Sequence, residues 1–130
     1  MPDLTSSQIR YLHTIYIECG NSEFVRSVDV AQKMGVTKAS VSRMVKFFAT
    51  YGFISAEKYG KIKLMPKGEK EGAVIHEKIT QIYPFFADYL GLDKSEALDS
   101  TYSFICSFSD NCIEKLLRKG WAVNNYVHIS

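Results

Sequence analysis

The chain is most constrained by the stretch 27–46, in which two short helical patterns are separated by a glycine. The first begins at Ser27, its expected N-cap, and ends at Gly35, which can adopt the positive φ that a tight turn requires. Thr37 can cap the second, whose apolar residues recur at helical spacing. Ala31 is small enough for one helix to cross the other. This stretch therefore predicts a helix-turn-helix.

Short alternating segments follow this motif. Residues 53–57 and 61–64 alternate apolar and polar side chains on either side of Tyr59-Gly60, a pattern typical of a β-hairpin. A hairpin in this position converts a helix-turn-helix into its winged form. We therefore expect residues 1–65 to form a winged helix-turn-helix domain.

The second half of the chain is predicted to be helical. Residues 67–90 form a long helical pattern that Pro84 must kink or interrupt, and two shorter helical patterns follow, up to residue 119. The expected fold class is mainly α with a small β-wing. A second, helical domain would cover residues 66–120, and residues 121–130 would form a C-terminal tail without a clear period.

The net charge of +2 conceals an uneven distribution. Residues 1–64 carry nine Lys and Arg against five Asp and Glu, a net charge of +4. Residues 65–130 carry seven against nine, a net charge of −2. A basic half joined to a mildly acidic one indicates an anionic partner on one side, although charge alone fits a solvated surface equally well.

The second helix of the motif would present polar and basic side chains to such a partner. A helix in the major groove of DNA contacts base edges with its N-terminal side chains, and Arg43 can pair with the two acceptors of a guanine. Lys46 suits a phosphate. The candidate DNA-binding residues lie on this helix, at its cap and in the wing: Ser27, Thr37, Lys38, Ala39, Ser40, Ser42, Arg43, Lys46, Lys58, Tyr59, Lys61 and Lys63.

Other classes of protein are disfavoured. No run approaches the roughly 18 apolar residues of a membrane span, and the N-terminus lacks the pattern of a signal peptide, so we expect a cytoplasmic protein without membrane association. An odd number of cysteines, Cys19, Cys106 and Cys112, indicates reduced thiols rather than a disulfide framework. No nucleophile–base arrangement, glycine-rich phosphate loop or spaced carboxylate pair is apparent, so we expect no enzyme.

The order of these elements resembles the diphtheria-toxin-repressor and manganese-transport-regulator family of metal-dependent bacterial repressors. The resemblance runs from about Leu4 to Lys119 and rests on these segments: 11–16 (YLHTIY), Val41-Ser42 with Val45, 64–68 (LMPKG, similar to the family's L-T-P-x-G), 91–93 (GLD) and Ser109-Asp110. It implies a homodimer on a palindromic operator in double-stranded DNA, with a C-terminal helical dimerisation domain. It also implies a bound Fe²⁺ or Mn²⁺ that favours operator binding.

The residues at the family's metal-ligand positions depart from this pattern. The first-helix pair is Arg10 and His13, and the final cluster has Tyr102 and Ile105 where the family has ligands, with Cys106 at its terminal histidine. Hard ions such as Mn²⁺ prefer carboxylate and imidazole ligands. Metal sensing is therefore either lost or rebuilt.

A rebuilt site would use His13, His76 and Cys106, a soft set that suits Zn²⁺ or Cu⁺ better than Mn²⁺. His76 lies three positions before the aligned ligand, so this site needs a shifted helix register. The effector stays open at this stage: a transition metal (Zn, Mn or Fe, by the resemblance) or none.

We expect a sequence-specific, DNA-binding transcriptional regulator that acts as a repressor of the iron- or manganese-dependent type. The alternatives are a small-molecule-responsive or effector-independent winged-helix regulator that has lost metal sensing, and a winged-helix protein-interaction module. Aromatic residues at helical spacing favour a core and dimer interface over an effector pocket. They are Tyr83, Phe85, Phe86, Tyr89, Phe104 and Phe108.

Overall fold

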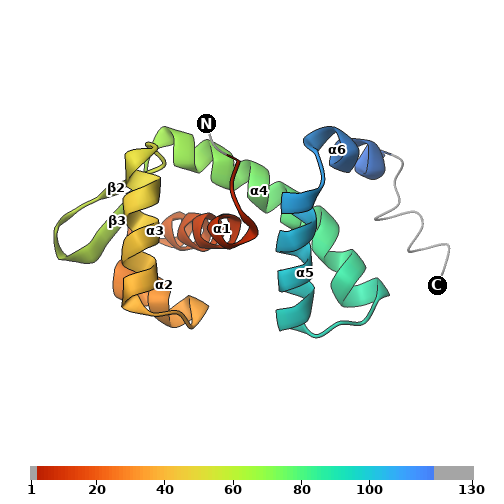
Figure 1. The fold of residues 1–130 in the computed structure, drawn as a ribbon, viewed down its shortest axis with the longest axis horizontal. Coiled ribbons are helices and arrows are strands. Elements are labelled where there is room, and N and C mark those ends of the chain that lie inside the picture. Colours follow the sequence, from red (N-terminus) through yellow and green to blue (C-terminus); the bar gives the residue numbers. More distant parts are fainter. Residues whose placement is uncertain (1–2, 119–130) are drawn as a thin grey trace. The chain divides into compact units, whose positions relative to one another are not determined.

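The computed structural model describes residues 3–118 and shows a mainly helical chain with one small antiparallel sheet (Figure 1). The expected fold class is confirmed, whereas the tail predicted for 121–130 lies outside the described residues. The elements are α1 (Ser6–Asn21), β1 (Val25–Arg26), α2 (Ser27–Met34), α3 (Lys38–Thr50), β2 (Ile54–Ala56), the 3-10 turn η1 (Lys58–Gly60), β3 (Lys61–Leu64), α4 (Pro66–Pro84), the π-helical turn η2 (Phe85–Tyr89), α5 (Lys94–Ser107) and α6 (Asp110–Arg118). None of the described helices has the length and apolar character needed to cross a membrane.

The chain divides into two compact units, which we describe separately. The first comprises Asp3 and Ser7–Ile75, and the second comprises Leu4–Ser6 together with the described residues from His76 onward. The division falls within α4, whereas the domain boundary predicted from the sequence lies at residue 65.

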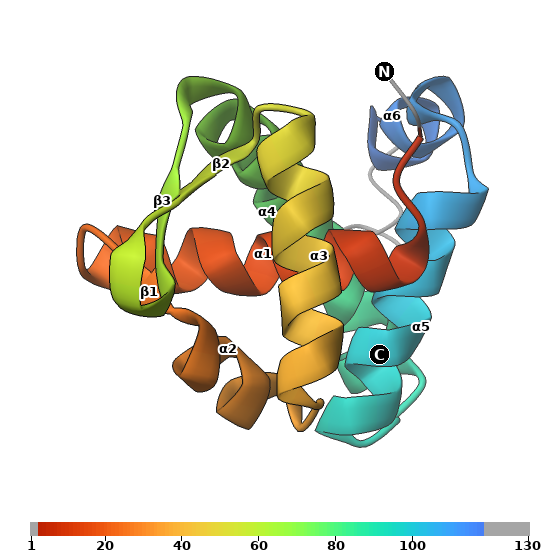
Figure 2. The same ribbon diagram turned by 60° about the vertical axis from the view of Figure 1, so that its left-hand side comes forward.

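The core of the first unit is built from the three N-terminal helices and the strand that follows them. Leu12 and Ile15 of α1, Val30 of α2 and Phe48 of α3 are almost completely buried, and so is Phe53. The rings of Phe48 and Phe53 pack edge to face with their centroids 5.6 Å apart. Figure 2 shows α3 crossing α1, with α2 beside it. This core fixes the orientation of α3.

The turn between α2 and α3 agrees with the sequence prediction at two residues and differs at a third. Gly35 ends α2 with φ of 65°, and the hydroxyl oxygen of Thr37 accepts a hydrogen bond from the backbone N–H of Ser40 at 3.1 Å. Ser27, however, is not the N-cap of α2. It is the first helical residue, because the chain enters α2 directly from β1, and Arg26 occupies the cap position.

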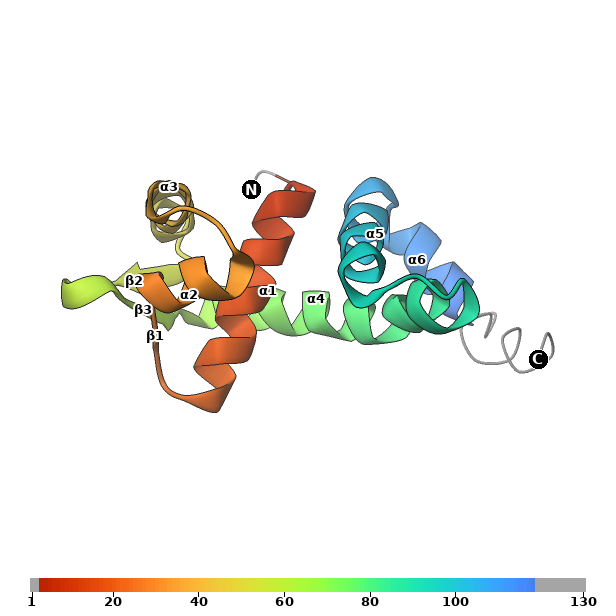
Figure 3. The ribbon, with the colours of Figure 1, turned by 90° about the horizontal axis from the view of Figure 1, so that it is seen from below.

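The sheet has the order β1-β3-β2 with antiparallel pairing throughout, so the predicted hairpin is confirmed as β2 and β3. The strand β1 was not predicted, because two residues carry no detectable period. It pairs Val25 with Ile62 and Arg26 with Lys61. In Figure 3, where α3 is seen nearly end-on, the wing projects beyond α2.

Close contacts at the start of α4 explain why residues 64–68 (LMPKG) include a glycine. The carbonyl oxygen of Phe53 accepts a hydrogen bond from the backbone N–H of Met65 at 3.0 Å, and a Cβ on Gly68 would overlap this same oxygen. One turn later, a Cβ on Gly72 would lie 2.5 Å from the ring of Tyr16. Both positions therefore require glycine for steric reasons rather than for positive φ.

The second unit consists of the end of α4 and the elements that follow. As predicted, Pro84 interrupts the long helix, and the chain continues as the turn η2 against which α5 packs. The side chain of Asp93 caps α5 and that of Ser109 caps α6, each by accepting a backbone N–H bond. Lys78 of α4 forms an ion pair with Asp110 of α6 at 2.5 Å.

Candidate nucleic-acid interface

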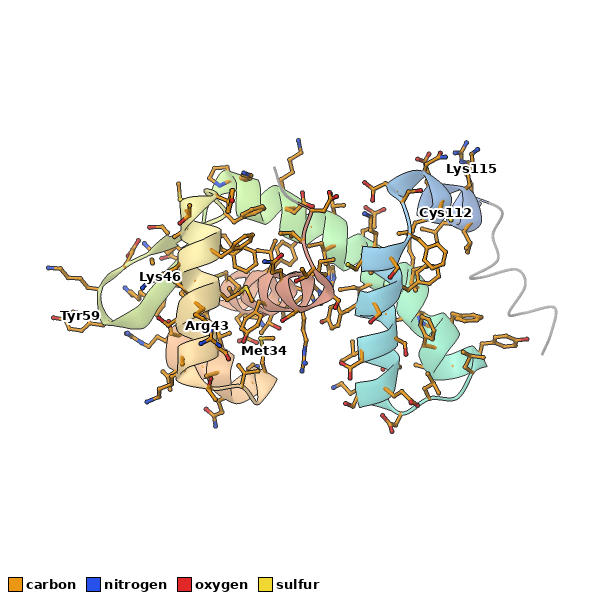
Figure 4. All side chains as sticks on the ribbon, viewed as in Figure 1. Met34, Arg43, Lys46, Tyr59, Cys112 and Lys115 are labelled. Carbon is orange, nitrogen blue, oxygen red and sulfur yellow. The ribbon has the colours of Figure 1, made fainter. Side chains whose placement is uncertain are left out.

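The exposed face of α3 carries most of the residues that the sequence singled out. Val41 and Phe48 anchor the opposite face in the core, which leaves Lys38, Arg43 and Lys46 exposed. Arg43 and Lys46 are three residues apart and so lie on one side of the helix, where Figure 4 labels them. Ala39 and Ser42 are exposed on the same helix, whereas Ser40 is half-buried.

A hydrogen-bonded series joins the cap of α3 to its arginine. Thr37 donates its hydroxyl to the Oγ of Ser40 at 3.1 Å, and the Nη2 of Arg43 donates to the same Oγ at 3.3 Å. The guanidinium is therefore held near the N-terminal turn of α3, with its remaining N–H groups available as donors. The arrangement restricts the rotamers of Arg43 on an exposed surface.

The four candidate residues of the wing lie in different environments. Tyr59 is 89% exposed at the tip, next to exposed Lys58 (Figure 4). The Nζ of Lys61 lies 4.2 Å from the centre of the Phe24 ring, a cation–π distance. Lys63 lies 3.9 Å from the carboxylate of Glu57 across the hairpin, which offsets part of its charge. Lys58 and Tyr59 are thus the residues best placed to meet a partner.

The side chains at the start of α2 form hydrogen bonds with the wing and do not cap their own helix. Ser27 donates its hydroxyl to the carbonyl oxygen of Gly60 at 3.3 Å, and Arg26 donates to the carbonyl oxygen of Tyr59 at 3.0 Å. Sequence reasoning missed Arg26 because an isolated exposed cation has no pattern. Arg26 lies directly before the first helix of the motif. Its side chain bonds to a wing residue that comes 33 positions later in the sequence.

The three residues of the predicted soft metal site fall in both units. His13 lies on α1 in the first unit, whereas His76 and Cys106 belong to the second. The thiol of Cys106 donates to the carbonyl oxygen of Leu4 at 3.5 Å. Within residues 3–118 no three His, Cys, Asp or Glu side chains are grouped so that they could hold a metal ion. The soft site therefore stays a prediction.

The remaining positions of the family's ligand set are not suited to a hard ion. Tyr102 and Ile105 are buried side chains of α5, and isoleucine has no donor atom. Arg10 on α1 is half-buried and carries a permanent positive charge. Residues of these types do not supply the carboxylate and imidazole ligands that Mn²⁺ or Fe²⁺ requires.

The cysteines are free thiols in the structure. Cys19 of α1 is half-buried and donates to the carbonyl oxygen of Ile62 at 3.7 Å. Burial raises the pKa of the Cys19 thiol, which favours its protonated form. This thiol acts as part of the packing between α1 and β3.

Comparison with known proteins agrees with this geometry. Residues 3–62 match the family described as iron dependent repressor, N-terminal DNA binding domain. Over 115 residues the chain is 29% identical to the HTH-type transcriptional regulator MntR of Lysinibacillus sphaericus, covering 86% of this chain and 80% of the relative. It is 28% identical over 115 residues to MntR of Bacillus pumilus, covering 86% of this chain and 77% of that protein.

Solved structures show the same fold over nearly the whole chain. The manganese regulator SloR matches with a TM-score of 0.73 at 24% identity, over 92% of this chain and 54% of SloR. IdeR of T. acidophilum matches with a TM-score of 0.68 at 14% identity, over 92% of this chain and 55% of IdeR. This chain thus spans about half the length of these two structures. With its helix-turn-helix, its wing and these relatives, the chain resembles the iron-dependent repressor family of DNA-binding transcriptional regulators, whose DNA-binding domain matches residues 3–62.

Proposed function

We propose that this regulator inserts α3 into the major groove of operator DNA and sets the wing against the neighbouring backbone. The observation that supports the proposal best is the exposed face of α3, where Lys38, Arg43 and Lys46 project from a helix whose other face is anchored in the core. The net charge of +4 on residues 1–64 supplies the attraction to phosphates.

Within this proposal the α3 residues have separate roles. Arg43, held by Ser40, pairs with the O6 and N7 of a guanine and specifies sequence. Lys38 and Lys46 contact phosphates and position the helix. Ser42 and Ala39 are exposed beside them and line the surface that faces the bases.

We further propose that the second unit joins two copies of the chain. Its surface exposes three large apolar side chains, Tyr89, Leu90 and Phe108. The ring of Phe108 packs on that of Phe104 with centroids 4.5 Å apart, so the exposed side chains continue an aromatic cluster. Exposed apolar patches of this kind mark association surfaces, and a symmetric homodimer matches a palindromic operator.

The proposed mechanism includes no step that depends on Mn²⁺ or Fe²⁺. Three of the family's ligand positions hold an arginine, a tyrosine and an isoleucine, and these residues do not fit a hard ion. Operator binding then needs no metal ion, or it responds to a soft ion such as Zn²⁺ held by thiol and imidazole groups. A binding role in the cytoplasm, without catalysis, accounts for the whole set of candidate residues.

The proposal is tested by measuring the fluorescence anisotropy of a labelled random-sequence duplex titrated with the full chain. We expect a Kd near the roughly micromolar range of non-specific binding, rising steeply with salt as counterions are released. A chain that leaves the duplex free even at low salt would instead support the winged-helix protein-interaction module and contradict the proposal.

A further inference from the structure

The wing tip is attached to the start of the helix-turn-helix by two consecutive residues. The Nη1 of Arg26 donates to the carbonyl oxygen of Tyr59 at 3.0 Å, and the Oγ of Ser27 donates to the carbonyl oxygen of Gly60 at 3.3 Å. Arg26 ends β1 and Ser27 begins α2. Two adjacent peptide groups at the far end of the hairpin are therefore bonded to the end of β1 and to the first residue of α2.

A third residue supports this attachment. The ring of Phe24 has the Nζ of Lys61 4.2 Å from its centre and the guanidinium carbon of Arg26 5.4 Å from it. The pairing of Arg26 with Lys61 between β1 and β3 brings both cations to the same ring. We call Phe24, Arg26 and Ser27 the wing latch. All of its contacts lie within the first unit.

The backbone at the wing tip has a conformation that needs such support. Tyr59 has φ of 63°, the left-handed region that residues other than glycine seldom adopt, and it is followed by Gly60 with φ of 71°. A strained conformation of this kind persists where surrounding contacts hold it. The bonds to the carbonyl groups of both residues hold it here, while the Tyr59 side chain stays exposed.

We propose that Arg26 and Ser27 are positioning residues that fix the wing tip relative to α2, and so relative to the recognition helix α3 that packs on α2. The inference rests on the proposed DNA-binding function. A latched wing presents Lys58 and Tyr59 in place before DNA arrives, and no ordering cost is incurred on binding. Without the latch, the tip must be ordered by the DNA itself.

The decisive variant is Ser27→Ala, because it removes a latch bond and leaves every charge in place. We expect its affinity for the random-sequence duplex to fall about fivefold, as for the loss of one hydrogen bond. We also expect the slope of log affinity against log salt to become shallower by about 1, because one wing phosphate contact is lost. The phosphate contact that is lost is the one made by Lys58, and Ser27 itself makes none.

The matched control is Ser22→Ala. Ser22 is an exposed serine that donates one hydrogen bond to a backbone carbonyl, that of Phe24, at 3.1 Å, as Ser27 does to the wing. Its removal should leave both the affinity and the salt slope unchanged. General destabilisation of the domain would affect both serine variants without changing the slope.

A double-mutant cycle separates a latch from a direct DNA contact. In a chain that already carries Lys58→Ala and Tyr59→Ala, Ser27→Ala should have little further effect, because the side chains that it positions are gone. A full and additive loss in that background would mean that Ser27 itself contacts DNA, and would overturn the latch.

Amide hydrogen exchange tests the latch without DNA. The N–H of Glu57 donates to the carbonyl of Lys61 across the hairpin, and this amide should exchange several-fold faster in Ser27→Ala than in the unchanged chain. An unchanged exchange rate and salt slope would overturn the latch while leaving the proposed function intact. Failure of the unchanged chain to bind the duplex would overturn the proposed function, and the role of the latch in binding with it.

Discussion

The two units of the molecule differ in how closely their side chains match the chemistry expected of the family. The first keeps each feature that a winged helix-turn-helix needs, from the positive φ of Gly35 to the exposed Arg43 of α3. The second keeps the helices and their caps but has Tyr102 and Ile105 where relatives are expected to place ligands. The unit proposed to bind DNA and the unit in which relatives are expected to hold metal ligands can thus diverge separately.

The difference has a physical cause. The proposed DNA binding by α3 depends on the scaffold that holds this helix, in which close contacts such as that of Gly68 with Phe53 tolerate no added atom. A metal site depends on a few donor atoms, and replacing them by buried apolar groups leaves the packing intact. This difference predicts that substitutions in the first unit strongly change stability or DNA affinity. Metal ions should change DNA affinity only slightly.

The largest effect is expected for Gly68→Ala. The added Cβ would overlap the carbonyl oxygen of Phe53, and the start of α4 must then shift, which should lower the free energy of unfolding by about 3 kcal/mol or abolish folding. Urea denaturation measures the change. Gly20→Ala is the control, since nothing lies within 4 Å of its added Cβ. Equal stability of the two variants would contradict the account of this contact.

The second effect concerns base recognition. Arg43→Ala should weaken binding to a selected operator by about 10- to 100-fold, the discrimination supplied by one bidentate arginine–guanine pair. Sedimentation should show an unchanged oligomeric state. Lys38→Ala, a change at a proposed phosphate contact on the same helix, should weaken operator and random-sequence duplexes alike. Unchanged operator affinity in Arg43→Ala would refute its assigned role.

The third effect concerns the proposed dimer of the second unit. Phe108→Ser removes an exposed ring from the aromatic cluster and should raise the dimer dissociation constant about tenfold, measured by analytical ultracentrifugation. Tyr51→Ser, a change of another exposed aromatic residue in the first unit, should leave it unchanged. The proposed interface would be wrong if both variants dimerised equally well.

The smallest effect is expected for metal ions. Mn²⁺ added to chelator-treated protein should change operator affinity by less than about twofold, because Arg10, Tyr102 and Ile105 stand where the family has ligands. The same titration with Zn²⁺, repeated with His13→Ala and Cys106→Ala, tests the rebuilt soft site. If Mn²⁺ strengthened operator binding tenfold or more, the second unit would have kept the metal response expected of the family.

Elements with a clear local pattern were predicted well from the sequence. Gly35 and Thr37 at the turn have the conformation and the cap bond expected of them. Local rules suffice there because the partner groups lie within a few residues.

Features that depend on distant contacts could not be predicted in this way. Ser27 has the residue type of an N-cap, yet its hydroxyl bonds to the wing 33 residues away. Lys61 appears as one of three equivalent wing cations, and only the fold places it over Phe24. The two-residue strand β1, which brings these groups together, is too short to have a period.

In vitro selection tests most directly whether the first unit recognises a specific DNA sequence. The full chain, treated with chelator, would be used to enrich bound duplexes from a random library, which are then sequenced. We predict an inverted repeat whose half-sites lie about one helical turn apart or a multiple of it. The same selection with Arg43→Ala should lose a guanine in each half-site. Recovery of unenriched random sequences from the unchanged chain would contradict such recognition.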